Sequence, residues 1–443
     1  MTLTREDISK WLAAVPSSSL SQEREQYCRK RLPPTPPMSE DEASPTKRLR
    51  ADPDATPTRP TLGPKYSSSY SRGSGSSTSA ASRHSRNGTK SPTKRIAYLQ
   101  MEQLIDYKPF GGSEAPPTAL QDFVKEIKQY ATGIGILSHD ELEKFRDARR
   151  DDNLFRDILE TKAVVDETDR REQLGKLPDV RTLIEIWNDA QECLLDGHAE
   201  ASWNCSVHFP LMKVSLQLAA ANSANGPCQT SDSSLRRDAQ ITPFNVTTAQ
   251  IVAPYTLTTV STKHDRRIDF CICISPRRKS ALSSAICHVA KQSDHFSINH
   301  SDYPPLIARP IGVSFEAKLP GSDWQPAIEQ LSAWMGGHWM RISELNQSAD
   351  DIADLQYLPG IIIQGHDWHF IAATRGPEVK KHKRRQIIIW NKILIGSTDT
   401  MQGICQIVVV LQRLAKWCHE SLLTWLLDTV LVRNETYQSD HGY

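Results

Sequence analysis

Long apolar runs are missing from this 443-residue sequence. No run of eighteen apolar residues occurs, so the sequence predicts no transmembrane helix. The first residues, MTLTRED, lack the apolar segment typical of a signal peptide. A mean hydropathy of −0.47 indicates that much of the chain is in contact with water. We therefore expect a nuclear or cytoplasmic location, and the basic segments described below favour the nucleus.

Several well-known chemical motifs are also missing. The nine cysteines form no C-x-x-C pair, which argues against a zinc ribbon or a thioredoxin-like site. Cys271 and Cys273 alternate along a predicted strand, so we interpret them as small core residues rather than metal ligands. The sequence has no G-x-S-x-G nucleophile elbow and no phosphate-binding P-loop.

The charge of the chain is small in total but uneven. Residues 43–95 hold eleven Lys or Arg and two Asp, a net charge of +9, so the total of +1 leaves −8 for the rest. The segment 1–95 is rich in Ser, Pro and Thr and is predicted to be a disordered tail. Its motifs SPTKRLR (44–50) and SPTKR (91–95) are candidates for nuclear import or nucleic-acid tethering, or are only solvated charges. Nucleic-acid affinity in the acidic body would require local basic patches.

Apolar periodicity divides the rest of the chain. Residues 96–180 have apolar residues three and four apart, which predicts a helical extension packed on the core. Residues 181–432 are expected to form the main domain, and 433–443 a short tail. The polar stretches 222–242 and 277–305 are interpreted as inserted loops. Strands are expected at 252–260, 268–275, 312–319, 360–364, 369–374 and 386–395, and helices at 120–130, 139–150, 154–162, 180–195, 326–342 and 401–432.

An acid and an amine stand two residues apart in VSFEAKLPG (313–321). Glu316 and Lys318 therefore point to the same face of a predicted strand. Taken alone, this common pair is more typical of an ordinary surface ion pair. The predicted strand RRIDFCICISP (266–276) contains Asp269 as its one acid, and a carboxylate in an apolar strand is costly unless paired or bound to a metal. If the two strands pair, Asp269 and Glu316 meet at the sheet surface with Lys318 beside them.

Two predicted helices flank these strands. HAEASWNCSVHF (198–209) places an E-x-x-W-N pattern on one helical face, and AIEQLSAWMGGHW (327–339) contains Q-L-x-x-W. In this order, with the I-D-F and E-A-K strands between them, the sequence resembles the PD-(D/E)XK, or restriction-endonuclease-like, nuclease superfamily. More closely, it is similar to the fungal nuclease-like branch. The resemblance covers roughly residues 96–432.

The resemblance implies an α/β fold with a central mixed β-sheet flanked by helices. It also implies that Asp269 and Glu316 bind Mg²⁺ or Mn²⁺ and that Lys318 assists the attacking water. By the same comparison, Glu200 matches the helix glutamate that often completes the metal shell. Gln330 matches a polar residue that some branches place beside the site.

From these residues we expect divalent-metal-dependent hydrolysis of nucleic-acid phosphodiester bonds, with DNA as the favoured substrate. The alternative is a catalytically inactive nuclease fold that binds DNA or protein in the nucleus. Ile268 stands where the family name places a proline, a departure that is frequent in the superfamily. The oligomeric state is left open by the sequence.

Two basic runs are candidates for contacts with a phosphate backbone: 277–279 (RRK) and 380–385 (KKHKRR). Each is also typical of a solvated loop. His366 and His369 in GHDWHF (365–370) form a conceivable metal pair, but no third ligand is evident, so a structural role is favoured.

Overall fold

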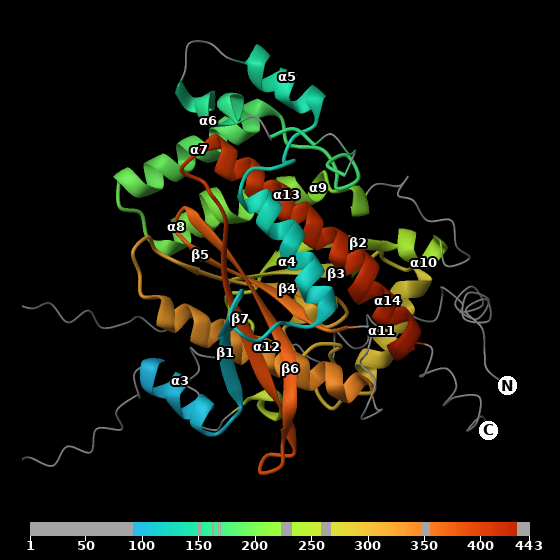
Figure 1. The fold of residues 1–443 in the computed structure, drawn as a ribbon. Coiled ribbons are helices and arrows are strands. Elements are labelled where there is room, and N and C mark those ends of the chain that lie inside the picture. The colour runs from blue at the N-terminus through green and yellow to red at the C-terminus, as the bar shows by residue number, and fades with distance from the viewer. Residues whose placement is uncertain are drawn as a thin grey trace, which may run out of the picture. The chain divides into compact units, whose positions relative to one another are not determined.

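The computed structural model describes residues 92–148, 153–161, 164–166, 168, 170–222, 233–257, 267–346 and 355–431 (Figure 1). All of these residues belong to one structural unit. The predicted disordered tail, apart from its last four residues, lies outside the described residues. Residues 92–95 begin the helix α3, so the prediction of disorder is wrong for them. The motif SPTKRLR and the predicted tail 433–443 also lie outside them.

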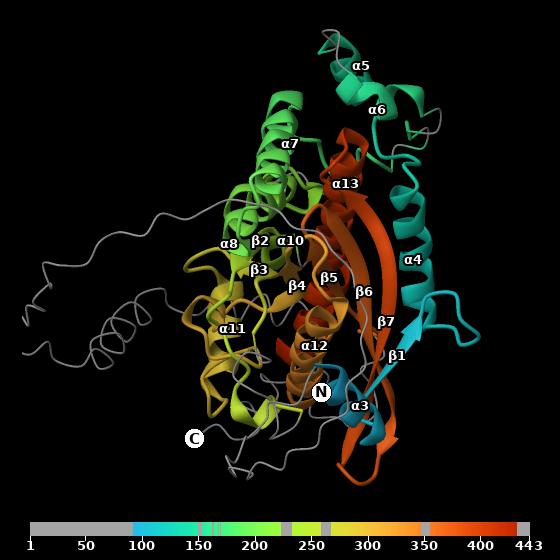
Figure 2. The same cartoon turned by 90° about the vertical axis from the view of Figure 1, so that its left-hand side faces the viewer.

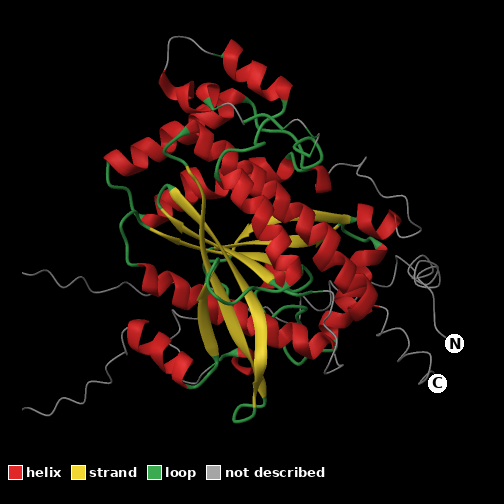
Figure 3. Cartoon of the chain, in the orientation of Figure 1, coloured by secondary structure: helices red, strands yellow, loops and turns green. Residues whose placement is uncertain are grey.

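A seven-stranded mixed sheet forms the centre of this unit (Figure 3). The strand order is β1-β7-β6-β5-β4-β3-β2. The pairs β1–β7 and β4–β5 are parallel, and the other neighbours are antiparallel. The predicted fold class, a mixed sheet flanked by helices, is therefore confirmed. The strands are β1 (Ile105–Pro109), β2 (Ala239–Asn245), β3 (Phe270–Pro276), β4 (Ile311–Lys318), β5 (Leu358–Gln364), β6 (Asp367–Val379) and β7 (Arg384–Ser397).

Helices cover both faces of the sheet. None of the helices in the described ranges combines the length and the apolar character needed to cross a membrane. The main helices are α3 (Pro92–Met101), α4 (Thr118–Ala131), α5 (His139–Asp147), α6 (Arg156–Glu160), α7 (Val180–Leu195), α8 (Glu200–Trp203), α9 (Phe209–Gln217), α10 (Ser233–Arg237), α11 (Ala281–Lys291), α12 (Trp324–Asn346) and α13 (Met401–Trp417).

The two faces of the sheet are distinguished by side chains of β6. Glu316 of β4 and His369 of β6 are aligned across β5, and residues in register share a face. The His369 ring contacts Trp324, the first residue of α12, at 5.3 Å. Phe370, the next residue of β6, packs instead on Phe123 of α4 at 5.6 Å. Thus Glu316 lies on the face covered by α12, and α4 covers the opposite face (Figure 2).

Most predicted elements are present within a few residues of their expected bounds. The predicted helix 180–195 is α7, which begins after Asp179, whose side chain accepts from the Thr182 amide. Gly197 follows its end with φ of 64°, as expected for a C-cap. The predicted helix 401–432 begins as α13 after the N-cap Thr400, but π-helical turns replace regular helix at Cys418–Leu422 and Leu426–Leu431.

Four further predictions of local structure are wrong. Residues 252–257 do not form the expected strand: the turn Ala253–Tyr255 is a 3-10 helix, because Pro254 has a fixed φ and no N–H to donate. The rest of that prediction, 258–260, lies outside the described residues. The expected loop 222–242 contains α10 and most of β2, the expected loop 277–305 contains α11, and the expected helical extension supplies the edge strand β1.

Candidate active site

Asp269 immediately precedes β3 and is fixed beside the end of β4. Phe270 and Phe315 are partners in the β3–β4 ladder. The backbone amide of Asp269 donates to the carbonyl of Phe315 at 3.1 Å. In return, its Oδ2 accepts a 2.8 Å hydrogen bond from the backbone amide of Ala317. The carboxylate is thereby placed next to the residues that carry the predicted glutamate and lysine.

Lys318, the last residue of β4, brings two further acids together. Its Nζ forms an ion pair with Oε1 of Glu316 and lies 3.9 Å from Oε2 of Glu200. It also donates to the carbonyl of Ala317 at 2.9 Å. Glu200 is the first residue of α8, so its carboxylate reaches the strand end from a separate element. The ammonium therefore lies between two carboxylates that are far apart in the sequence.

Burial dominates the pKa values in this cluster. It raises the pKa of Glu316 well above the usual 4.5, the Asp269 carboxylate raises it further, and Lys318 offsets this only in part. Burial likewise raises the pKa values of Asp269 and Glu200. Burial lowers the pKa of Lys318, but the neighbouring acids outweigh it, so the pKa is raised overall. The protein thus gathers three acids around an ammonium that stays protonated at neutral pH.

The donor atoms of this cluster are of the chemical kind that a divalent cation binds. Glu316 is only 1% exposed, and its Oε2 has no hydrogen-bond partner among the described residues. A buried oxygen without a partner costs stability. Asp269 Oδ1 accepts a long 3.4 Å hydrogen bond from Asn204. These carboxylate oxygens, with Glu200 at the rim, are the hard donors that Mg²⁺ prefers.

A different group of described residues brings three ligand atoms within 4.8 Å of one another: Glu192, Asp196 and His198, at and after the end of α7. Both acids are exposed. The sequence analysis did not single out this group. Exposed acids at a helix end are common without any ion, so we assign no role to it. The ligand atoms of the predicted set, Glu200, Asp269 and Glu316, do not all come this close together, and Glu200 and Glu316 contact Lys318 instead.

A buried histidine that the sequence analysis missed supports Asp269 indirectly. Asn204 and His208 begin and end a π-helical turn, and such turns are frequent at functional sites. His208 Nδ1 lies 2.9 Å from Asn204 Oδ1, and its Nε2 lies 2.9 Å from the Gly365 carbonyl. Because a carbonyl only accepts, Nε2 carries a proton. Close polar contacts thus link the turn at Gly365 through His208 and Asn204 to Asp269. The spacing of four residues between Asn204 and His208 was the available signal.

The remaining predicted residues lie around this cluster. His366 Nδ1 is 2.9 Å from the Thr398 hydroxyl, and its ring meets Trp203 edge-on at 4.9 Å. His366 and His369 therefore have packing contacts, in line with the structural role favoured above. Gln330 is a partly buried residue of α12, the helix that packs on β4. Its role in the site stays a prediction.

Both basic runs lie away from the acids. Residues 277–279 follow the end of β3, whereas Asp269 precedes its start. Residues 380–385 span the turn between β6 and β7 and the start of β7. Lys318 is in register with Gln364, which pairs with the first residue of β6. The basic run 380–385 and the acid cluster therefore lie at opposite ends of β6.

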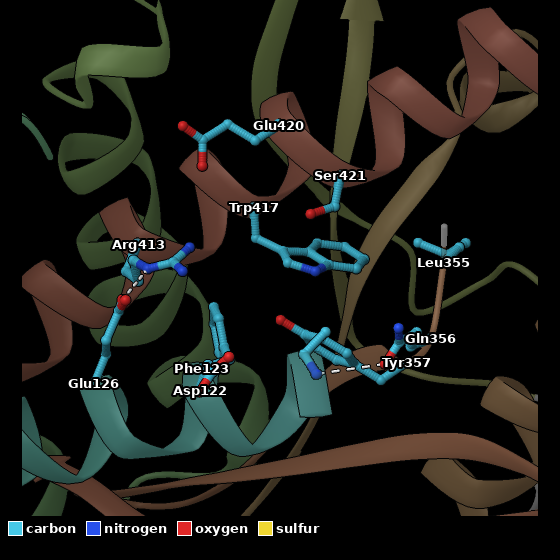
Figure 4. A pocket seen from close by; sticks show the side chains of 11 residues that line it. Asp122, Phe123, Glu126, Leu355, Gln356, Tyr357, Arg413, Trp417, Glu420 and Ser421 are labelled. Carbon is cyan, nitrogen blue, oxygen red and sulfur yellow. Dashed lines mark hydrogen bonds and ion pairs between the residues drawn. The ribbon is translucent and has the colours of Figure 1, made fainter. Parts of the chain in front are cut away.

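A cavity of about 140 Å³ lies elsewhere, between α4, the start of β5 and the α13 region (Figure 4). Arg413 is paired there with Glu126. Asp122 and Glu420 add two acids to the lining. A phosphodiester is an anion and is repelled by such a lining, so this cavity is a poor phosphate site. Its lining residues are Ala119, Asp122, Phe123, Glu126, Leu355, Gln356, Tyr357, Arg413, Trp417, Glu420 and Ser421.

The fold and the cluster define an α/β protein with three carboxylates and one amine near the end of β4, an inner strand of the mixed sheet. The family model of the PD-(D/E)XK nuclease superfamily matches residues 144–423. This match covers more than half of the chain, and the protein belongs to that superfamily. Membership indicates a nucleic-acid substrate and metal-dependent hydrolysis. Searches of curated proteins and of solved structures found no significant match.

Proposed function

We propose that this protein hydrolyses phosphodiester bonds of nucleic acids with a divalent metal ion, Mg²⁺ or Mn²⁺. Asp269 and Glu316 are the proposed metal ligands, Glu200 completes the ligand set, and Lys318 assists the attacking water. The observation that carries the proposal is the buried Glu316 oxygen without a partner, beside a second buried acid and an ammonium. Such an arrangement costs folding stability, and a packing role does not account for it.

Each residue has a distinct task in this proposal. When bound, the metal would polarise a phosphate oxygen and lower the pKa of a coordinated water. Asp269 uses one oxygen to accept from the Ala317 amide; its other oxygen, which accepts only a long hydrogen bond from Asn204, is the proposed ligand atom. Glu316 supplies its unpartnered oxygen.

Lys318 acts through its charge. The neighbouring acids raise its pKa, which favours the ammonium form. It donates hydrogen bonds that orient the water and offsets the negative charge that gathers on the phosphate during attack. A lysine suits this task because its ammonium is a compact point charge on a flexible stem.

Cleavage assays test the proposal. Single- and double-stranded DNA and RNA are incubated with the protein and Mg²⁺ or Mn²⁺. We expect cleavage by the wild type and a loss of about 10²–10⁴-fold in Lys318→Ala. Lys125→Ala is the control, because Lys125 is an exposed residue of α4. Background-level products that are identical for the wild type and Lys318→Ala would refute hydrolysis.

Metal titration separates an enzyme from an inactive nucleic-acid or protein binder. We expect weak Mn²⁺ binding to the wild type and its loss in Asp269→Ala, because that change removes a ligand oxygen. A binder without catalysis has no need of the acid cluster. Equal Mn²⁺ binding by the wild type and Asp269→Ala would favour the binder and count against the assigned ligands.

A further inference from the structure

The β6–β7 hairpin projects beyond the rest of the sheet. β5 pairs with β6 only as far as Ala373, and β1 pairs with β7 only from Ile387 onward. The end of the hairpin, residues 374–386, therefore continues as a two-stranded ribbon beyond both neighbours. Figures 1 and 2 show it leaving the sheet on the side away from α8.

The tip of this ribbon is strongly basic. All six residues from 380 to 385 are Lys, His or Arg, and Lys380, Lys383 and Arg385 are exposed. Glu102 at the end of α3 contacts two of the others, Lys381 at 2.5 Å and His382 at 3.1 Å. The chain outside its basic tail segment carries a net charge of −8. The ribbon tip is thus a local positive patch on an acidic body.

The ribbon is held in place along one side. The Arg375 guanidinium lies over the Trp339 ring of α12 at 5.5 Å. Arg384 donates to the carbonyl of Thr256 at 3.4 Å and contacts the Met340 sulfur at 3.7 Å. These contacts join the ribbon to α12, the helix that also packs on β4. The distance from the tip to the acid cluster is therefore fixed by the fold.

That distance corresponds to about one turn of duplex. Twelve residue steps separate Asp367, beside the acid cluster, from Val379 at the tip. Strands rise about 3.3 Å per residue, so β6, with its three register shifts, spans up to about 40 Å. Duplex DNA advances about 3.4 Å per base pair, so 40 Å spans about 10–12 base pairs. A two-stranded ribbon also has the size that the DNA major groove admits.

We propose that the basic ribbon tip is a second contact surface for the nucleic acid, about one helical turn from the bond that is cut. Lys380, Lys383 and Arg385 bind phosphates there while the acid cluster holds the scissile phosphate. This inference rests on the proposed function for its substrate. It adds a length requirement: short nucleic acids reach only one of the two surfaces.

Binding measured by fluorescence anisotropy in Ca²⁺, without cleavage, tests the proposal. The ribbon variant is Lys380→Gln/Lys383→Gln/Arg385→Gln. The control, Lys125→Gln/Lys128→Gln/Lys144→Gln, removes the same charge from exposed helix surfaces. For a 30-base-pair duplex we expect the ribbon variant to bind more weakly than the wild type. The slope of the logarithm of the binding constant against the logarithm of the salt concentration should become shallower by about 2–3, because each lost phosphate contact contributes about 0.9. The control variant should keep the wild-type slope. The wild type and the control should bind a 30-base-pair duplex more tightly than an 8-base-pair duplex, and only the ribbon variant should lose this preference.

Three results would overturn the proposal. Equal binding by the ribbon and control variants would remove the ribbon from the interface. An equal loss for 8- and 30-base-pair duplexes would refute the spacing. A ribbon-dependent affinity for anionic vesicles or acidic proteins, without one for duplexes, would assign the tip to another partner. A separate cleavage assay with Mg²⁺ tests the proposed function. If the protein binds duplexes through the ribbon but does not cut them, the proposed function is refuted, whereas the ribbon is still a contact surface.

Discussion

Replacing Glu316 by glutamine should stabilise the protein while abolishing its metal binding. Glu316 is almost fully buried, and one carboxylate oxygen has no partner in the described part of the chain. Burial is the largest cause of its raised pKa, so the ionised form is destabilising at neutral pH. Glutamine has a similar volume and carries no charge. Glu316→Gln therefore removes a cost of folding together with a proposed metal ligand.

The size of the effect follows from two opposing contributions. Removing the buried charge relieves about 1–3 kcal/mol, although the amide keeps a polar atom at the position of the unpartnered oxygen. Losing the ion pair with Lys318 opposes this, but that ammonium remains near Glu200 at 3.9 Å and near Asp269. We therefore expect the free energy of unfolding to rise by about 1–2 kcal/mol at pH 8 without metal. In a chain of this size, each kcal/mol raises Tm by about 2–4 °C or slightly less.

The sign of the pH dependence provides a second test. A carboxyl whose pKa is raised by folding stabilises the folded state at pH values below the pKa that it has in the unfolded chain. This stabilisation is lost as the pH rises through the pKa that it has in the folded protein. Wild-type stability should thus fall between about pH 4.5 and the raised pKa, and Glu316→Gln should flatten this fall. The measurement is thermal unfolding in EDTA from pH 5 to 8.

Metal and a matched variant complete the experiment. Mn²⁺ at one hundred times its Kd should stabilise the wild type by about 2.7 kcal/mol and leave Glu316→Gln unchanged. Glu329 is a buried glutamate of α12 that is paired with Arg95 at 3.0 Å, so Glu329→Gln should be destabilising. The reasoning is refuted if Glu316→Gln unfolds at a lower temperature than the wild type at pH 8 without metal.

Two further predictions concern residues around the cluster. His208→Phe removes the contacts to Asn204 and Gly365, so we expect Mn²⁺ affinity and cleavage to fall about 10–100-fold. Asn204→Ala should cause a loss of the same size. The double variant should lose no more than either single variant, because both residues act through the same contact. Unchanged Mn²⁺ affinity would exclude this positioning role. Gly365→Ala places a Cβ 2.2 Å from Pro320 at φ of 58°, so we expect a loss of about 2–4 kcal/mol in denaturant unfolding. Gly321→Ala, at φ of 70° with nothing within 4 Å, should cost only about 1 kcal/mol, and equal losses would refute the steric argument.

The sequence by itself determined the elements that carry the chemistry. Asp269 in an apolar strand and the E-x-K spacing of Glu316 and Lys318 are local patterns, because strand alternation decides which side chains share a face. Helices with clear apolar periodicity, such as α7, were predicted at the correct positions. The order of these motifs was sufficient to predict the α/β fold class and the superfamily.

Only the tertiary structure decided which distant residues meet. The polar segment that forms β2 becomes a strand because β3 offers it a hydrogen-bonding edge, and β1 is held in the same way by β7. The contact of Glu200 with Lys318 and the polar contacts from Gly365 through His208 also depend on how α8 lies on the sheet. The basic residues 380–385 were visible in the sequence, but their separation from the acids is set by the length of β6 and its pairing with β5. Such contacts depend on long-range pairing and packing, which a local pattern of residue types does not encode.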